Sequence, residues 1–109
     1  MTVKEVSENL NIELVAGEAG VNSPVTGCYI GDLLSMVMSH AKCGDAWITI
    51  QGNINVPAVA SLTEIAMVII AEGQIPDKNT EDRCNIEGIP LYKSDKSAFE
   101  LACMVEKCL

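Results

Sequence analysis

The sequence has few aromatic residues, few basic residues and a single histidine among its 109 residues. Aromatics make up 4%, and 7 Lys and Arg face 15 Asp and Glu, which gives a formal net charge of −8. Proteins that bind nucleic acid cluster basic residues to displace counterions from phosphates, and anionic bilayers attract basic segments in the same way. Because the seven basic residues are scattered along the chain, we expect neither nucleic-acid nor membrane binding.

Long hydrophobic runs and targeting signals are also missing. The longest fully apolar run, residues 65–71, has seven residues, whereas a membrane span needs about 20. The first ten residues contain two acidic side chains and no signal-peptide pattern. With an acidic surface, these features predict a cytoplasmic protein.

The cysteines do not form a recognisable ligand or redox pattern. There are five of them, none in a CxxC pair, and only His40 is available to complete a zinc site. We therefore expect reduced, mostly buried thiols and no metal. His40 is predicted to contact the last carbonyls of its helix and not to act as a base.

Motifs for nucleotide and acyl-transfer chemistry are absent as well. The sequence contains no GxxxxGK[ST] loop, no GxGxxG after its first strand and no GxSxG turn. These absences predict a protein that is not an enzyme and that carries no cofactor.

Hydrophobic periodicity predicts a single α/β domain over residues 1–109, a length typical of one domain. Helices and strands are expected to alternate in the order α-β-β-α-β-α-β-α-β-α, as a layered domain with a mostly parallel sheet flanked by helices. The unbroken apolar stretch 67–71 predicts a central strand. Pro90 favours an edge position for strand 89–92, and Ser94–Asp95 is expected to cap the last helix.

Four strand–helix junctions are candidate ligand sites, because open α/β sheets bind ligands beyond the carboxyl ends of their strands. They are residues 31–32, 51–55, 72–74 and 94–95. In the second, Gln51, Asn53 and Asn55 surround Gly52, and amides can both donate to and accept from a polar ligand. The alternative is that an asparagine caps the helix and Gly52 makes the turn.

Thr26 and Gly27 are a further candidate within the second predicted strand. A glycine inside a strand lets a ligand or another backbone approach closely. A local bulge, or tight packing of a symmetry-related chain, would explain the same glycine.

Residues 22–28, Asn-Ser-Pro-Val-Thr-Gly-Cys, resemble the motif after which the DRTGG domain is named. The resemblance extends through residues 44–51, 55–60, 88–91 and 94–100, and so covers nearly the whole chain. Thr26 and Gly27 match the motif, whereas Asn22–Ser23 stands in place of its Asp-Arg and Cys28 in place of its second glycine.

The resemblance implies a fold similar to the N-terminal domain of HPr kinase/phosphorylase and a regulatory role. We therefore expect a non-catalytic regulatory and oligomerisation module, by default a homodimer, that senses a small polar or anionic effector. The ligand-binding candidates are Thr26, Gly27, Gln51, Gly52, Asn53, Asn55, Ser94 and Asp95. Candidates for the subunit interface are Met36, Met38, Ile54 and Met67.

Two other functions remain open at this point. An acidic interaction subunit would dock to a basic redox enzyme of the hydrogenase type, or to a metabolic enzyme, in a salt-dependent way. A phosphate-chemistry enzyme is the third hypothesis, suggested by proteins in which DRTGG domains occur.

Overall fold

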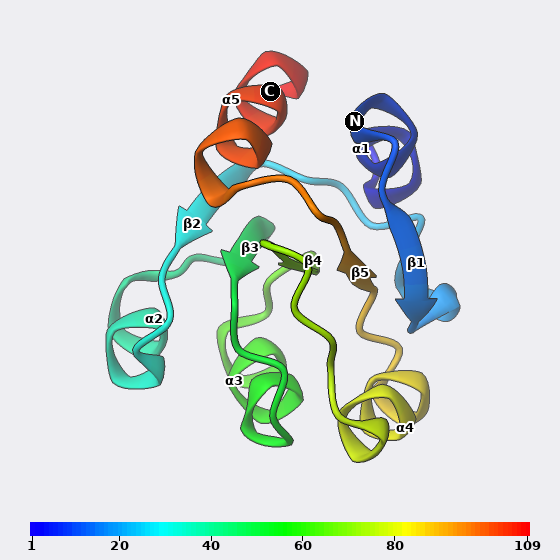
Figure 1. Ribbon diagram of the computed structural model, residues 1–109, viewed down its shortest axis with the longest axis vertical. Coiled ribbons are helices and arrows are strands. Elements are labelled where there is room, and N and C mark those ends of the chain that lie inside the picture. Colours follow the sequence, from blue (N-terminus) through cyan, green and yellow to red (C-terminus); the bar gives the residue numbers. More distant parts are fainter.

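A computed structural model describes residues 1–109, in which five helices alternate with five strands (Figure 1). The helices are α1 (Val3–Leu10), α2 (Leu34–His40), α3 (Asn55–Thr63), α4 (Lys78–Glu87) and α5 (Ala98–Cys108). The strands are β1 (Glu13–Ala16), β2 (Gly27–Ile30), β3 (Asp45–Thr49), β4 (Met67–Ile70) and β5 (Leu91–Lys93). The predicted order is confirmed, with a short 3₁₀ helix, η1 (Glu18–Gly20), added between the first two strands.

The five strands form one sheet in the order β1-β5-β4-β3-β2. Strands β2 to β5 are parallel, and β1 pairs antiparallel with β5. Strand β4 is central and fully buried, as its unbroken apolarity predicted. The carboxyl ends of β2 to β5 therefore share one edge of the sheet, and the start of β1 joins them there because β1 runs the other way.

Helices cover both faces of the sheet, and each face has its own hydrophobic core. Figure 1 shows α1 and α5 on one face and α2, α3 and α4 on the other. Alternate residues of one strand enter different cores: Ile48 packs with α1 and α5, whereas Trp47 packs on the opposite face. Burying a large apolar side chain stabilises the fold by roughly 1.5–3 kcal/mol, so these layers fix where the loops at the sheet edges lie.

The edge position predicted from Pro90 is wrong. Strand β5 pairs with β4 on one side and with β1 on the other. Pro90 precedes the first strand residue, where its missing N–H costs no ladder bond, and its carbonyl accepts a hydrogen bond from the N–H of Val68 at 2.9 Å.

The last helix begins later than predicted, and its cap is Ser97 instead of Ser94–Asp95. Ser97 Oγ accepts from the N–H of Glu100 at 3.1 Å, and Glu100 Oε1 accepts from the N–H of Ser97 at 3.3 Å. Ser-x-x-Glu at 97–100 supplies both halves of a capping box, which residues 94–97 cannot. Ser94 and Asp95 are thereby left in the loop that follows β5.

Of the four interface candidates, Met67 is excluded because it is completely buried in β4. Met36, Met38 and Ile54 are each about half exposed. None of the helices combines the length and the apolarity that crossing a bilayer requires.

Candidate functional site

The structure divides the predicted site residues between two opposite edges of the sheet. Residues 51–55 and 94–95 follow β3 and β5 and lie at the carboxyl edge. Thr26 and Gly27 lie where β2 begins, at the amino edge. They do not come together in a single site.

The amides of the β3–α3 junction bind one another. Asn53 Nδ2 donates to Gln51 Oε1 at 3.0 Å, and Asn53 Oδ1 accepts from the N–H of Asn55 at 2.9 Å. Gln51 Nε2 also donates to the carbonyl of Asp32 at 3.3 Å. These amides are therefore engaged within the protein. The N-cap of α3 is Ile54, and no side chain caps it, so neither asparagine is the helix cap that the alternative expected.

Gly52 serves a close contact between two loops. A Cβ at this position would lie 2.8 Å from Pro76 Cα. The Gly52 carbonyl accepts from Thr80 Oγ1 at 2.8 Å and from the N–H of Asp77 at 2.9 Å. The glycine therefore fastens the start of α4 to the end of β3.

Asp32 ties the β2–α2 junction to the neighbouring strand. Its Oδ1 accepts from Thr49 Oγ1 at 2.9 Å and from the N–H of Ile50 at 2.8 Å. Sequence reasoning placed Asp32 at a ligand-binding junction, but its carboxylate holds the edge strand β2 against β3.

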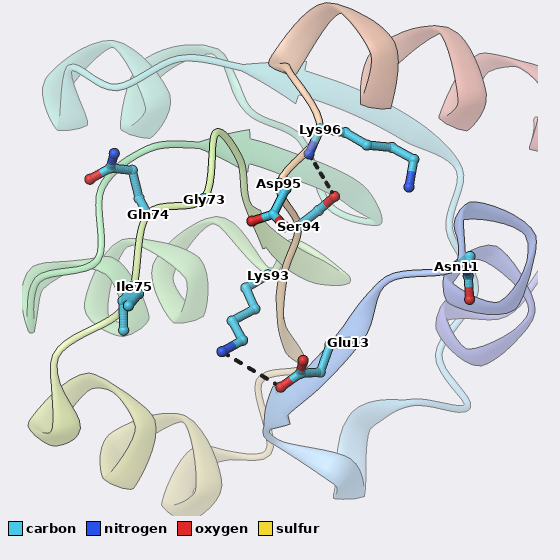
Figure 2. A pocket seen from close by; sticks show the side chains of 9 residues that line it. All are labelled: Asn11, Glu13, Gly73, Gln74, Ile75, Lys93, Ser94, Asp95 and Lys96. Atoms are coloured by element: carbon cyan, nitrogen blue, oxygen red, sulfur yellow. Dashed lines mark hydrogen bonds and ion pairs between the residues drawn. The ribbon is translucent and has the colours of Figure 1, made fainter.

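The fourth junction opens into a pocket of about 410 Å³ at the carboxyl edge (Figure 2). It lies between the loops after β4 and β5 and the start of β1. Its lining is almost entirely polar: Asn11, Glu13, Gly73, Gln74, Ile75, Lys93, Ser94, Asp95 and Lys96. Ser94 and Asp95 were predicted as ligand residues, and Gly73 and Gln74 belong to the predicted third junction.

Backbone hydrogen bonds hold the two loops of this pocket together. The N–H of Gly73 donates to the Ser94 carbonyl at 3.0 Å, and the N–H of Glu72 donates to the Lys96 carbonyl at 2.9 Å. Gly73 has a φ of +71°, and a Cβ there would lie 3.2 Å from Asp95 Oδ1. The left-handed turn favours glycine here, and the nearby carboxylate would have to shift slightly to admit a side chain.

The charged side chains of the pocket are two lysines and two acids. Lys93 Nζ lies 3.6 Å from Glu13 Oε2, and both side chains remain substantially exposed. Figure 2 shows Lys93 reaching toward Glu13, with Ser94 and Asp95 on the turn beyond β5. An exposed pair of this kind contributes little to stability, so the lysine can exchange its partner for a ligand anion at small cost.

Sequence reasoning missed Asn11, Glu13, Lys93 and Lys96. Asn11 and Glu13 precede or begin a strand, and they reach the carboxyl edge only because β1 is antiparallel. Lys93 and Lys96 flank the predicted Ser94–Asp95 and were not singled out. The one sequence signal that could have identified Lys93 and Lys96 is that they lie on either side of the Ser94–Asp95 junction.

A second hollow of about 410 Å³ lies at the amino edge beside β2. Its lining is Thr26, Gly27, Cys28, Tyr29, His40, Lys42, Cys43 and Asp45. A Cβ on Gly27 would overlap Asp45 Oδ1, while Asp45 Oδ2 accepts from the N–H of Lys42 at 2.8 Å. The close approach expected at Gly27 is thus made by a side chain of the same molecule.

The remaining candidates for chemistry are His40 and the cysteines. His40 Nδ1 lies 3.0 Å from the Met36 carbonyl, as predicted for a residue at a helix end, and its ring stacks on Tyr29. All five cysteines are free thiols, but the prediction that most are buried is wrong: only Cys84 is buried, and Cys43 and Cys103 are exposed. Burial, with the added repulsion of Asp45, raises the pKa of the Cys28 thiol to about 11.

Comparison with known proteins gives a likeness of fold. No family model and no curated protein sequence matches the chain. The fold is similar to a crystal structure of the CBS and DRTGG domains of the regulatory region of Clostridium perfringens pyrophosphatase, complexed with the activator diadenosine tetraphosphate. The TM-score is 0.73 at 12% identity, over 99% of this chain and 47% of the other.

The chain therefore spans about half the length of that regulatory structure. At this identity the likeness shows the fold, and it agrees with the α/β architecture implied by the resemblance to DRTGG domains. The similar structure is a regulatory region of an enzyme and not its catalytic part.

Proposed function

We propose that this protein is a non-catalytic regulatory module that binds a small polar or anionic ligand in the carboxyl-edge pocket and acts as a homodimer. The observation that carries the proposal is the pocket itself, which gathers polar groups from three segments of the chain at the edge where open α/β sheets bind ligands. Its volume of about 410 Å³ suits a small molecule.

The lining favours a charged ligand over an aromatic one. Ile75 is its one hydrophobic residue, so a flat apolar ring finds little surface to cover. Lys93 and Lys96 offer ammonium donors to phosphate or carboxylate oxygens, and Asp95 offers an acceptor to hydroxyl or amino groups. Two of the seven basic residues line this pocket beside the acids Glu13 and Asp95, and their ammonium groups point to different sides of the Ser94–Asp95 turn (Figure 2). Each lysine can therefore contact a separate anionic group of a ligand.

The position of the pocket supports a role in signalling. A ligand that bridges Lys93 and Gln74 would join the loops after β5 and β4, which already share two backbone hydrogen bonds. It would also hold the segment that leads into α5. A ligand that binds the folded state alone stabilises that state, by an amount that rises with the logarithm of ligand concentration above the dissociation constant. Occupancy would then be reported to a partner as more rigid loops at the carboxyl edge.

The chemistry of the lining supports binding and not turnover. The pocket contains no histidine or cysteine. The hydroxyl of Ser94 accepts from the N–H of Lys96 at 3.0 Å and has no basic side chain within hydrogen-bond distance. A serine nucleophile needs such a base.

Diadenosine tetraphosphate is one probe, because it is the activator in the similar regulatory structure, and the polar lining would contact its phosphates and not its adenine rings. Isothermal titration calorimetry of the full chain would compare it with ATP and inorganic pyrophosphate. We expect at least one of the three to bind, and Lys93→Gln and Lys96→Gln each to weaken that binding about tenfold, since a charge-assisted hydrogen bond contributes roughly 1.5–3 kcal/mol.

Lys78→Gln is the matched control. Lys78 is an exposed lysine on α4 that pairs with Asp82 and lies outside the pocket. The control should bind as the unmodified chain does. Absence of heat with all three probes, or equal weakening by all three lysine variants, would argue against the site.

A further inference from the structure

The two outermost strands of the sheet, β1 and β2, differ in how their unpaired sides are protected against pairing with a further strand. The β1 edge carries the exposed charge of Glu13, a break in register between Leu14 and Ala16, and the 3₁₀ helix η1 directly after it. The β2 edge, Gly27–Ile30, has no charge, no proline and no break in register with β3. Proteins use such devices to prevent strand pairing between molecules, and β2 has none of them.

We propose that β2 pairs antiparallel with β2 of a second copy of this chain, about a two-fold axis, to form a continuous ten-stranded sheet. The inference rests on the proposed homodimer and assigns its surface. Because only β2 is open in each molecule, the assembly stops at a dimer. The β1 strands, at the two outer sides of the joined sheet, remain protected against further pairing.

Charge favours a second copy as the occupant. Residues 27–41 contain one acidic side chain, Asp32, and no lysine or arginine. The Asp32 carboxylate is already bonded to Thr49 and Ile50. Two molecules of charge −8 repel each other least where they meet through an uncharged stretch, whereas a basic partner would find little to recognise there.

Exposed apolar side chains flank this edge. Ile30 is 48% exposed at the end of β2, Leu33 is 65% exposed just before α2, and Met36 is 45% exposed on α2. Figure 1 shows α2 at the same end of the sheet as β2. Covering these side chains removes apolar area from water, and the flexible methionine adapts to a facing surface.

The amino-edge hollow gives the partner room. Cys28 packs on the core formed with α1 and α5, while Tyr29 packs on the core of the opposite face. Both nevertheless line the same hollow. The hollow thus extends from the amino end of β2 along Gly27, Cys28 and Tyr29, and leaves space beside the strand at which a partner would begin to pair.

Sedimentation velocity of the full chain at micromolar concentration tests the proposal. We expect a species of twice 11.6 kDa. Ile30→Lys and Met36→Lys should each raise the dimer dissociation constant at least about tenfold, since the core of an interface excludes charge. Ile86→Lys is the control, because Ile86 is 74% exposed on α4, at a distance from β2.

Hydrogen exchange of the unmodified chain gives a second readout that needs no variant. Amides of residues 27–30 should exchange more slowly as protein concentration rises. A monomer at all concentrations would overturn both the dimer and its surface, and would leave the ligand proposal intact. A dimer that resists both lysine variants, with no concentration dependence in residues 27–30, would overturn the β2 surface alone.

Discussion

At the scale of single residues, Cys28 and Cys84 hold their protons more tightly than ordinary thiols. Burial raises the pKa of each to about 11, with Asp45 adding to the effect at Cys28, and Glu87 and Glu81 at Cys84. Because thiolate is the reactive form, a raised pKa protects a cysteine from oxidation and alkylation at neutral pH. We therefore expect Cys28, which lies in the motif-like segment, to react slowly with oxidants and alkylating reagents at neutral pH.

Iodoacetamide labelling with mass-spectrometric site assignment checks the expected low reactivity of Cys28. A pKa near 11 in place of 9.0 lowers the thiolate fraction roughly a hundredfold, and the greater nucleophilicity of a more basic thiolate recovers roughly tenfold of that loss. Cys28 should react at least about tenfold more slowly than the exposed Cys103 at pH 7, and should gain rate as pH rises toward 11. Equal rates for the two cysteines at pH 7 would contradict the account.

At the scale of elements, the helix ends are set by short local patterns. The first helix begins with a capping box in which Thr2 Oγ1 accepts from the N–H of Glu5 at 3.2 Å and Glu5 Oε1 accepts from the N–H of Thr2 at 2.8 Å. The last helix begins with the same arrangement at Ser97 and Glu100. Each box satisfies backbone donors that the helix itself leaves unpaired.

Ser97→Ala should therefore destabilise the protein by about 1 kcal/mol, the usual cost of losing a cap. Ser94→Ala is the informative partner, since Ser94 lies in the pocket loop and caps no helix. Urea unfolding should show a smaller loss for Ser94→Ala than for Ser97→Ala. The reverse order would mean that the helix starts where the sequence alone first placed it.

Local sequence patterns predict the helices and strands well, but they predict less well which strands pair with one another. The order of helices and strands and the central place of residues 67–71 follow from periodicity and apolarity. The interior position of β5 could not be read from Pro90, because the proline precedes the paired residues. The contribution of Asn11 and Glu13 to the pocket depends on the antiparallel pairing of β1 with β5, a long-range contact without a local sequence signature.

At the scale of the whole molecule, the sheet offers two different surfaces. Its carboxyl edge presents a polar pocket between the loops after β4 and β5, with paired charges of both signs. The free side of β2 presents an uncharged, apolar edge. The regulatory module that we propose would receive its ligand at the first surface and assemble through the second.

The most direct test of the ligand site is a ¹H–¹⁵N NMR titration of the full chain with diadenosine tetraphosphate and inorganic pyrophosphate. The account predicts amide shifts that saturate and that concentrate at Gly73, Gln74, Ser94 and Lys96, with Asn53 and Asn55 unmoved. The Lys93→Gln, Lys96→Gln double variant should lose these shifts while keeping the spectrum of a folded protein. Saturating shifts at residues 51–55 or at Thr26 and Gly27, with none around the pocket, would contradict it.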